Sequence, residues 1–313
     1  MAYPIEKKLV IAVASSALFD LSESDKVFRE EGEAAYRKHQ EKKKDVQLQK
    51  GVAFPFIRRF LNLNQAFPER QPVEVVLLSK NDPETGMRVF NSIASHHLDI
   101  TRAAFLTGKP AYEYLPAFNA SLFLSANERD VREAVNVGFA AGIVLESEVK
   151  DDDASDHELR IAFDFDGILA DDEAEQIYKK KGLEAFQQHE TNKAQIPHAP
   201  GLLHDLFKKL SFFQKLELKQ LKNDPNYKRH LRIAIVTARN APVHERVVTT
   251  LKSWGVMPDE TFFLGGINKG RILDVLKPHI FFDDQMDHLK EASKYVPSVH
   301  VPFGKLNTKY KTL

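Results

Sequence analysis

The chain carries one sequence pattern twice, and this repetition constrains its fold more than any other feature. At an offset of 150 residues, IAVASSALFD (residues 11–20) aligns with IAFDFDGILA (residues 161–170). The same offset aligns GEAAYRKH (residues 32–39) with GLEAFQQH (residues 182–189). Because self-similarity at a fixed spacing is typical of repeated structural units, we expect two copies of one unit.

A second set of matches follows at an offset of about 158 residues, in the same order in both halves. It pairs VVLLSKN with IAIVTAR, FLTG with FLGG, and FLSANERDVREA with FFDDQMDHLKEA. The pattern therefore predicts an internal duplication with halves at residues 1–150 and 155–313. The acidic stretch at residues 151–158 lies at the seam, and its composition favours a solvated linker over a cation site.

Each half predicts the same order of strands and helices. The apolar, strand-length runs are LVIAVA, VEVVLLS, AAFLTG and SLFLSA in the first half, and LRIAFD, LRIAIVT, TFFLGG and HIFFDD in the second. Helical periodicity separates them, as in the run with Val247, Val248, Leu251 and Trp254. Continuous apolar strands that alternate with helices favour an α/β fold, a parallel sheet covered by helices on both faces. Residues 171–230 form a helix-rich insert, placed like a cap.

Composition excludes several classes of protein. Lys and Arg together number 44, as do Asp and Glu, so no net charge favours nucleic acid or an anionic membrane as a partner. The absence of cysteine excludes disulfides, a thiol nucleophile and zinc–thiolate sites, and it fits a cytoplasmic protein. The first residues resemble a secretion signal, but the same strand recurs in mid-chain, which favours a structural strand.

Chemistry-bearing side chains follow the predicted strands of the second half. They are Asp164 and Asp166 after the first strand, Thr237, Ala238 and Arg239 after the second, Lys269 after the third, and Asp283 and Asp284 after the last. In an open parallel sheet, sites lie at the carboxyl ends of the strands, so these residues are expected to meet at one edge. Taken singly, each residue has an ordinary structural interpretation, such as a helix cap for the last pair. Together they fit Mg²⁺-assisted phosphoryl transfer to an aspartate.

Electrostatics explains why such a site needs cations. A carboxylate that attacks a phosphate dianion is repelled by roughly 4 kcal/mol for each unit pair, at about 4 Å and an effective dielectric of about 20. Mg²⁺ prefers oxygen ligands, which Asp164, Asp284 and the backbone carbonyl of Asp166 can supply. Lys269 adds a point charge for the phosphate and Thr237 a hydroxyl donor. Asp166 is placed to protonate the leaving oxygen and later to deprotonate water.

These four motifs resemble those of the haloacid dehalogenase superfamily of aspartyl-phosphate phosphatases, whose sheets are Rossmann-like. The first motif of that superfamily is D-x-D-x-[TV], and Ile168 takes the last position here. From about Leu9 to Gly304, the chain is similar to the cytosolic 5′-nucleotidase I family, which prefers AMP. The similarity rests on IAVASSALF, FPF, IVTAR, LKSWG, HIFFDDQM and HVPFG. Where the family has D-G-D-A-V, this chain has D-F-D-G-I, which places Phe165 beside the nucleophile position.

The resemblance implies hydrolysis of nucleoside 5′-monophosphates with Mg²⁺. It implies Asp164 as the nucleophile and Asp166 as the acid/base. Thr237 and Lys269, with Ala238 between the motif residues, would bind the phosphate. Asp164, Asp166 and Asp284 would hold the metal. Asp283 is the less direct metal partner, because only one of two adjacent side chains easily points at one ion.

Residues that contact the nucleobase are harder to predict. Phe186, His189 and Asn192 in the insert are candidates for stacking or hydrogen bonding, although the first two recur as Tyr36 and His39, which favours a scaffold function. Arg239 is a candidate for binding the phosphate or the base, with a salt bridge to a neighbouring carboxylate as the alternative. The basic run at residues 37–44 is interpreted as an exposed helix face.

The first half keeps the pattern but not the carboxylates. Ala14, Ser16 and Ala126 stand where the second half has Asp164, Asp166 and Asp284, whereas Ser79 and Lys109 keep phosphate-binding chemistry. We therefore expect a catalytically inactive half that packs against the other half or binds a regulatory nucleotide. Two alternatives to a nucleotidase stay open: a phosphatase or phosphotransferase for another small phosphate, and a nucleotide-binding regulatory protein. Whether the chain forms a homo-oligomer is also open.

Overall fold

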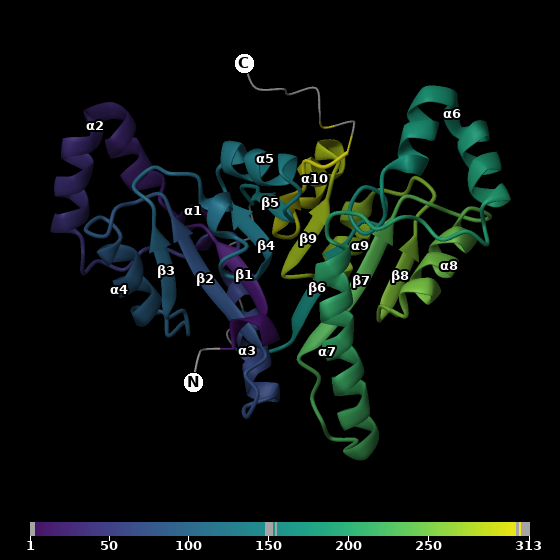
Figure 1. Cartoon of the computed structure of the whole chain (residues 1–313), viewed down its shortest axis with the longest axis horizontal. Helices are drawn as coiled ribbons and strands as arrows, with labels where there is room; N and C mark the ends of the chain where they lie inside the picture. Colours follow the sequence, from purple (N-terminus) through teal and green to yellow (C-terminus); the bar gives the residue numbers. More distant parts are fainter. Residues whose placement is uncertain (1–3, 148–152, 154, 305–306, 308–313) are drawn as a thin grey trace. The chain divides into compact units, whose positions relative to one another are not determined.

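The computed structural model describes residues 4–147, 153, 155–304 and 307, and Figure 1 shows the arrangement of helices and strands. The chain divides into two compact units, Met1–Val144 and Leu145–Leu313. Each unit is an α/β structure in which helices accompany a parallel sheet, as the alternating pattern predicts. Residues 151, 152 and 154 of the predicted acidic linker lie outside the described residues.

The first unit contains a five-stranded parallel sheet in the order β3-β2-β1-β4-β5. Its strands are β1 (Leu9–Val13), β2 (Val73–Ser79), β3 (Arg102–Phe105), β4 (Ala120–Ser125) and β5 (Ala141–Val144). Every residue of β1 and β2 is buried, which is what a continuous apolar run in the middle of a covered sheet requires. Of these five strands, β5 is the one that the apolar runs did not predict.

The helices of the first unit follow the predicted order. They are α1 (Ser15–Leu18), α2 (Ser22–Lys42), α3 (Phe54–Ala66), α4 (Met87–Ser95) and α5 (Glu128–Asn136), with short 3₁₀ helices at Ile5–Lys7 and Ala111–Tyr114. The helix α2 is kinked at Gly32, where φ is +82° and glycine avoids the steric cost that a side chain would add.

The second unit repeats this arrangement with the strand order β10-β9-β6-β7-β8, again parallel throughout. Its strands are β6 (Leu159–Phe163), β7 (Leu231–Thr237), β8 (Glu260–Phe263), β9 (Ile280–Asp283) and β10 (Ser298–His300). Its helices are α6 (Glu173–Asn192), α7 (His204–Asn223), α8 (His244–Trp254), α9 (Lys269–Leu276) and α10 (Met286–Ala292).

Alternating side chains of the second sheet pack against helices on opposite faces. Ala162 belongs to a buried cluster with Leu273 of α9 and Leu289 of α10. The next residue, Phe163, points the other way and meets Phe207 of α7 edge-on, with ring centroids 5.6 Å apart. Two-sided covering leaves the strand ends as the place where polar side chains can gather.

The insert between β6 and β7 has two parts with different positions. The helix α6 stands at the carboxyl ends of the strands (Figure 1). It is kinked at Gly182, whose φ of +82° equals that of Gly32. By contrast, α7 runs along the sheet and buries an apolar stripe that includes Leu206, Phe207 and Leu210. Of the two helices of the insert, α6 is therefore the one that lies at the strand ends.

Candidate active site

The predicted residues of the second unit lie at one edge of its sheet. Asp164 follows β6 directly, Thr237 is the last residue of β7, and Asp283 is the last residue of β9. Lys269 is the first residue of α9 and Asn268 caps that helix, its side chain accepting the Gly270 N–H at 2.7 Å. Since β6 lies between β7 and β9, parallel pairing brings these ends together.

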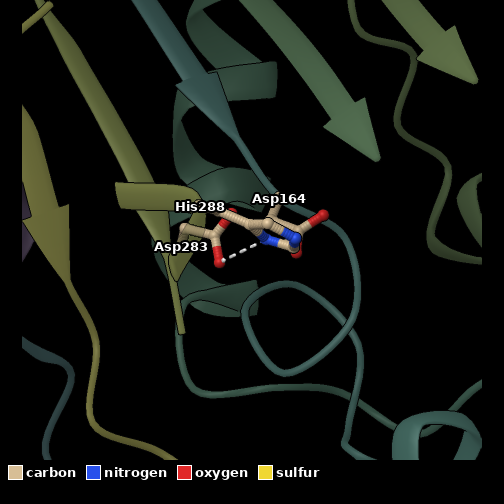
Figure 2. A group of neighbouring side chains, drawn as sticks. All are labelled: Asp164, Asp283 and His288. Carbon is tan, nitrogen blue, oxygen red and sulfur yellow. Dashed lines mark hydrogen bonds and ion pairs between the residues drawn. The ribbon is translucent and has the colours of Figure 1, made fainter. Parts of the chain in front are cut away.

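Lys269 bridges two buried carboxylates. Its ammonium lies 2.9 Å from Asp164 Oδ2 and 2.7 Å from Asp283 Oδ2. Burial opposes the charge on Lys269, but the two carboxylates more than offset this and raise the pKa of the ammonium. His288 of α10 places Nδ1 3.2 Å from Asp283 Oδ2, and Figure 2 shows this side chain converging with both carboxylates. Lys269 thus fixes both carboxylates by a charge-assisted contact.

The two carboxylates bound to Lys269 differ in how well their charge is stabilised. Asp283 also accepts the Gln285 N–H at 2.8 Å, and although burial opposes its charge, Lys269 and His288 lower its pKa. Asp164 also accepts the Phe165 N–H, but burial, together with the charges of Asp283 and Asp166, raises its pKa to about 7. Of these two carboxylates, Asp164 therefore has the less stabilised negative charge.

Asp284 is a buried carboxylate with an open oxygen. Its Oδ1 has no hydrogen-bond donor among the described residues. Burial, followed by the neighbouring carboxylates of Asp283, Glu175 and Asp164, raises its pKa well above the usual value. Gly167 has a φ of +71°, and a Cβ there would lie 2.7 Å from Asp284 Oδ2. Glycine thus leaves room for this carboxylate to approach the loop after β6, and an open carboxylate oxygen is a ligand type that a hard divalent cation prefers.

Asp166 is clamped by Arg239 rather than pointing freely. Arg239 donates from Nε and Nη2 to the two oxygens of Asp166, each at 2.7 Å. The Arg239 backbone N–H donates to Thr237 Oγ1 at 3.3 Å, which fixes the loop after β7, and Ala238 between them is exposed. Of the alternatives predicted for Arg239, the structure shows the salt bridge to a carboxylate.

The predicted base-contacting residues lie on the second half of α6, in unequal positions. The half-buried ring of Phe186 stacks against Arg239, whose guanidinium carbon is 5.5 Å from the ring centroid. His189 Nε2 lies 3.6 Å from Glu173 Oε1, within an ion-pair cluster. Asn192 is the last residue of α6 and is exposed. Of the three, only Phe186 contacts a residue that touches Asp166.

Sequence reasoning missed the residues behind Arg239. Glu190 is fully buried on α6 and forms ion pairs with Arg239 and Arg246, and His198 Nε2 lies 3.1 Å from Glu190 Oε2. Burial opposes the charge on Glu190, but His198 and Arg239 lower its pKa to about 2. A signal was present in the repeat, because the first half has Gln40 at the position that matches Glu190.

Comparison with protein families shows the family to which this chain belongs. The model of the family described as 5′-nucleotidase matches residues 1–308. The chain belongs to the 5′-nucleotidase family. Human "Cytosolic 5′-nucleotidase 1B" is 34% identical to it over 292 residues, which are 91% of this chain and 47% of that protein. The predicted similarity to a 5′-nucleotidase family is therefore confirmed.

This 5′-nucleotidase family chain spans about half the length of that curated relative. Among solved structures, a histidinol dehydrogenase from Elizabethkingia anophelis aligns with 77% of this chain and 49% of that chain, at 9% sequence identity. The TM-score of this alignment is 0.23. Among the described helices of this family member, none combines the length and the apolar character needed to cross a bilayer.

The first unit of this 5′-nucleotidase family chain has a cavity of about 270 Å³ at the ends of β1, β2 and β4. Its polar lining combines hydroxyl and amide side chains with one lysine and two carboxylates, namely Ser15, Ser16, Ser79, Ser125, Asn81, Asn127, Lys80, Asp25 and Asp130. Ser79 Oγ lies 3.2 Å from Ser15 Oγ, and Lys80 pairs with Asp130. Lys109, the lysine expected here, is exposed, and Lys80 contributes the cation instead.

Proposed function

We propose that this chain is a Mg²⁺-dependent 5′-nucleotidase that hydrolyses nucleoside 5′-monophosphates, AMP among them, through an aspartyl-phosphate. The observation that carries the proposal is the Asp164–Lys269–Asp283 cluster beside Asp166 and Asp284, in a chain of the 5′-nucleotidase family. The cluster combines a buried carboxylate, a fixed cation and a second acid at one edge of a parallel sheet. Acyl-phosphate chemistry needs these three components.

Asp164 is the proposed nucleophile because its charge is held in place but poorly stabilised. Lys269 fixes one oxygen, while burial raises the pKa to about 7, so the carboxylate retains basicity that bonding to phosphorus can use. In the first step, an Asp164 oxygen bonds to phosphorus and the bond from phosphorus to the ribose O5′ breaks. The ammonium of Lys269 also lowers the repulsion between this carboxylate and the phosphate.

Asp166 is the proposed acid/base. It gives a proton to O5′ as that oxygen leaves, and the nucleoside departs. In the second step, Asp166 takes a proton from a water molecule whose oxygen attacks the same phosphorus. The bond from phosphorus to Asp164 then breaks, which releases inorganic phosphate and regenerates the carboxylate. Thr237, through its hydroxyl, and the exposed backbone at Ala238 are proposed to bind the phosphate oxygens.

The donor set fits Mg²⁺. Asp164 and Asp284 would hold the ion, with the backbone carbonyl of Asp166, and the open Oδ1 of Asp284 supports this assignment. Asp283 is proposed to act indirectly, because Lys269 and His288 already occupy its oxygens. When bound, the ion supplies positive charge that neutralises the phosphate and the carboxylates.

The test of this function is hydrolysis of a panel of nucleoside monophosphates by the purified chain. We expect phosphate release with Mg²⁺, its loss in EDTA and its recovery when Mg²⁺ is restored. Asp164→Asn should abolish turnover, with Asp45→Asn, an exposed acid on the first unit, as the matched control. Residual turnover in Asp164→Asn would remove the assigned nucleophile, and turnover of sugar phosphates alone would favour the phosphatase alternative.

The first unit motivates a second proposed function, the binding of a regulatory nucleotide or phosphate. Its cavity at the ends of β1, β2 and β4 is lined by Ser79 and Lys80. Ala14, Ser16 and Ala126 also line it, at the positions that match the carboxylates of the second unit. We propose that this half is an inactive duplicate of the catalytic half, and that α6 acts as the cap. The matching strand orders and the identical glycine kinks support both proposals. A cytoplasmic location follows from the name of the human relative, and is likewise a proposal.

A further inference from the structure

The clamp on Asp166 is the last link of a buried chain of ion pairs. Arg239 holds both oxygens of Asp166, and its Nη1 donates to Glu190 Oε2. Arg239 Nη2 also lies 3.1 Å from His198 Nε2. Glu190 is fully buried and Arg239 is 4% exposed, so neither charge is screened by solvent. The position of Asp166 therefore depends on groups that never reach the strand ends themselves.

Such a network has two possible purposes, because a buried ion pair can hold the fold together or arrange a site. The first unit separates these purposes, since it builds the same scaffold from a different sequence. Matched backbone and side-chain hydrogen bonds show which residues correspond. The Asn81 N–H donates to Ser79 Oγ at 3.2 Å, and the Arg239 N–H donates to Thr237 Oγ1 at 3.3 Å. Asn81 thus stands in the place of Arg239.

The same method pairs His198 with Leu48. The Leu48 N–H donates to Ser92 Oγ at 2.9 Å, and the His198 N–H donates to Thr250 Oγ1 at 3.0 Å. Each of these hydroxyls in turn donates to the carbonyl of an arginine one turn earlier. Ser92 Oγ lies 2.8 Å from the Arg88 carbonyl oxygen, and Thr250 Oγ1 lies 2.7 Å from the Arg246 carbonyl oxygen.

Glu190 pairs with Gln40 by its place in the helix. Each is a buried side chain two residues before the end of its helix, at Lys42 in α2 and Asn192 in α6. Their exposed fractions are 4% for Gln40 and 0% for Glu190. The two side chains have nearly the same shape and differ in charge.

The scaffold part of the network is common to both units. Arg88 Nε donates to the Val46 carbonyl at 3.0 Å, as Arg246 Nε donates to the Ile196 carbonyl at 2.9 Å. Each unit also has a lysine after the helix that pairs with an acid near the helix start, Lys43 with Glu23 and Lys193 with Glu173. These contacts hold both units in shape and carry no information about catalysis.

The rest of the network differs between the two units, as the proposed catalytic carboxylates do. Where the second unit has the charged Asp166, Arg239 and Glu190, the first has Ser16, Asn81 and Gln40. His198 is replaced by Leu48. The first unit folds with neutral side chains at all four positions, so the fold does not require this charge.

We propose that Arg239, Glu190 and His198 are positioning residues for Asp166, retained for catalysis and not for folding. Glu190 pairs with the guanidinium, His198 Nε2 lies 3.1 Å from both Glu190 Oε2 and Arg239 Nη2, and the guanidinium holds the carboxylate of Asp166. A bidentate arginine uses one lone pair of each carboxylate oxygen, which leaves the others to face the leaving oxygen and the water. Because Glu190 lies on α6, this chain of contacts also couples the helix above the strand ends to the acid/base.

The proposal rests on the proposed hydrolytic function, and the test uses two kinds of leaving group. Glu190→Gln installs the side chain that the first unit tolerates at Gln40. We expect kcat for a nucleoside monophosphate to fall about 10- to 100-fold with KM within about threefold, because general acid–base groups contribute 10²–10⁴-fold. In single turnover, p-nitrophenolate release from p-nitrophenyl phosphate should change less than about threefold, since that leaving group needs no proton. Arg239→Asn should lower kcat for the nucleoside monophosphate more than Glu190→Gln does. Arg239→Lys should restore only part of that kcat, because lysine cannot donate bidentately.

Two comparisons separate positioning from stability. Glu173→Gln breaks a scaffold ion pair of the same Arg246 and should leave kcat within about twofold, with a lower thermal midpoint. In an Asp166→Asn background, Glu190→Gln should have almost no further effect, as expected for a residue that acts through Asp166. Equal losses for both leaving groups, or an additive loss in the double variant, would overturn the proposal. If the wild type cleaves alkyl phosphates but no nucleotide, the substrate is wrong and the same pair of leaving groups still tests the clamp.

Discussion

Asp164→Asn should stabilise the metal-free protein even as it abolishes turnover. The folded state raises the pKa of Asp164 from 3.8 to about 7, because burial and two neighbouring carboxylates oppose its charge. At pH 8 the ionised side chain therefore destabilises the fold relative to an exposed aspartate. An amide of nearly the same shape removes this charge and still accepts from Lys269.

The magnitude follows from the shift. A difference of about 3 pKa units corresponds to about 4 kcal/mol at about 1.4 kcal/mol per unit. Replacing the charged acceptor of Lys269 with a neutral one lowers the gain by about 1 kcal/mol. We expect the free energy of unfolding to rise by about 2–3 kcal/mol at pH 8, or roughly 5–10 °C in thermal midpoint for a unit of this size.

The pH dependence has a definite sign. The folded state binds more protons at Asp164 than the unfolded state between about pH 4 and 7, so the stability of the wild type falls as pH rises through that window. The variant lacks this group, and its advantage should therefore grow from pH 5 to pH 8 and vanish below about pH 4. Thermal and urea unfolding in EDTA, at several pH values, measure this difference.

Asp283→Asn is the matched control with the opposite expected sign. Asp283 binds the same ammonium at 2.7 Å, but its pKa is lowered. Its charge therefore stabilises the folded state at pH values above 3.8, the usual pKa of an aspartate. Removing it should cost about 3–5 kcal/mol at neutral pH, as for a broken buried ion pair. The reasoning would be refuted if Asp164→Asn were no more stable than wild type at pH 8, or if both variants shifted in the same direction.

Three further predictions test other parts of the structure. Gly167→Ala should raise the Mg²⁺ concentration needed for half-maximal turnover at least tenfold, because its Cβ would lie 2.7 Å from Asp284 Oδ2 and φ is +71°. Lys80→Ala should weaken calorimetric binding of a nucleotide to the first unit, whereas Lys109→Ala should not, and equal effects would exclude the cavity as the site. Glu217→Ala should lower the free energy of unfolding by about 2–4 kcal/mol with KM unchanged, since this buried carboxylate accepts two backbone N–H groups at the start of β7; unfolding in urea measures it.

The sequence predicted most of the fold because the relevant signals are local or repeated. Apolar runs of strand length alternate with helical periodicity, and that alternation predicts a parallel sheet without any knowledge of contacts. The strands β5 and β10 were not predicted, because they are short runs of four and three residues whose pairing depends on a neighbouring strand. The insert was expected to lie over the site as a whole, but α7 packs along the sheet through Phe207 and Leu210.

In the candidate site too, some features follow from the sequence and others only from the tertiary structure. The sequence by itself determined which residues stand at the strand ends, because strand register places Asp164, Thr237 and Asp283 at one edge once the strands are parallel. Only the tertiary structure decided the partners, namely that Lys269 bridges Asp164 and Asp283 and that Arg239 clamps Asp166. Those contacts join residues from 14 to 105 positions apart in the chain, and their pairing depends on side-chain direction and burial, which no local pattern encodes.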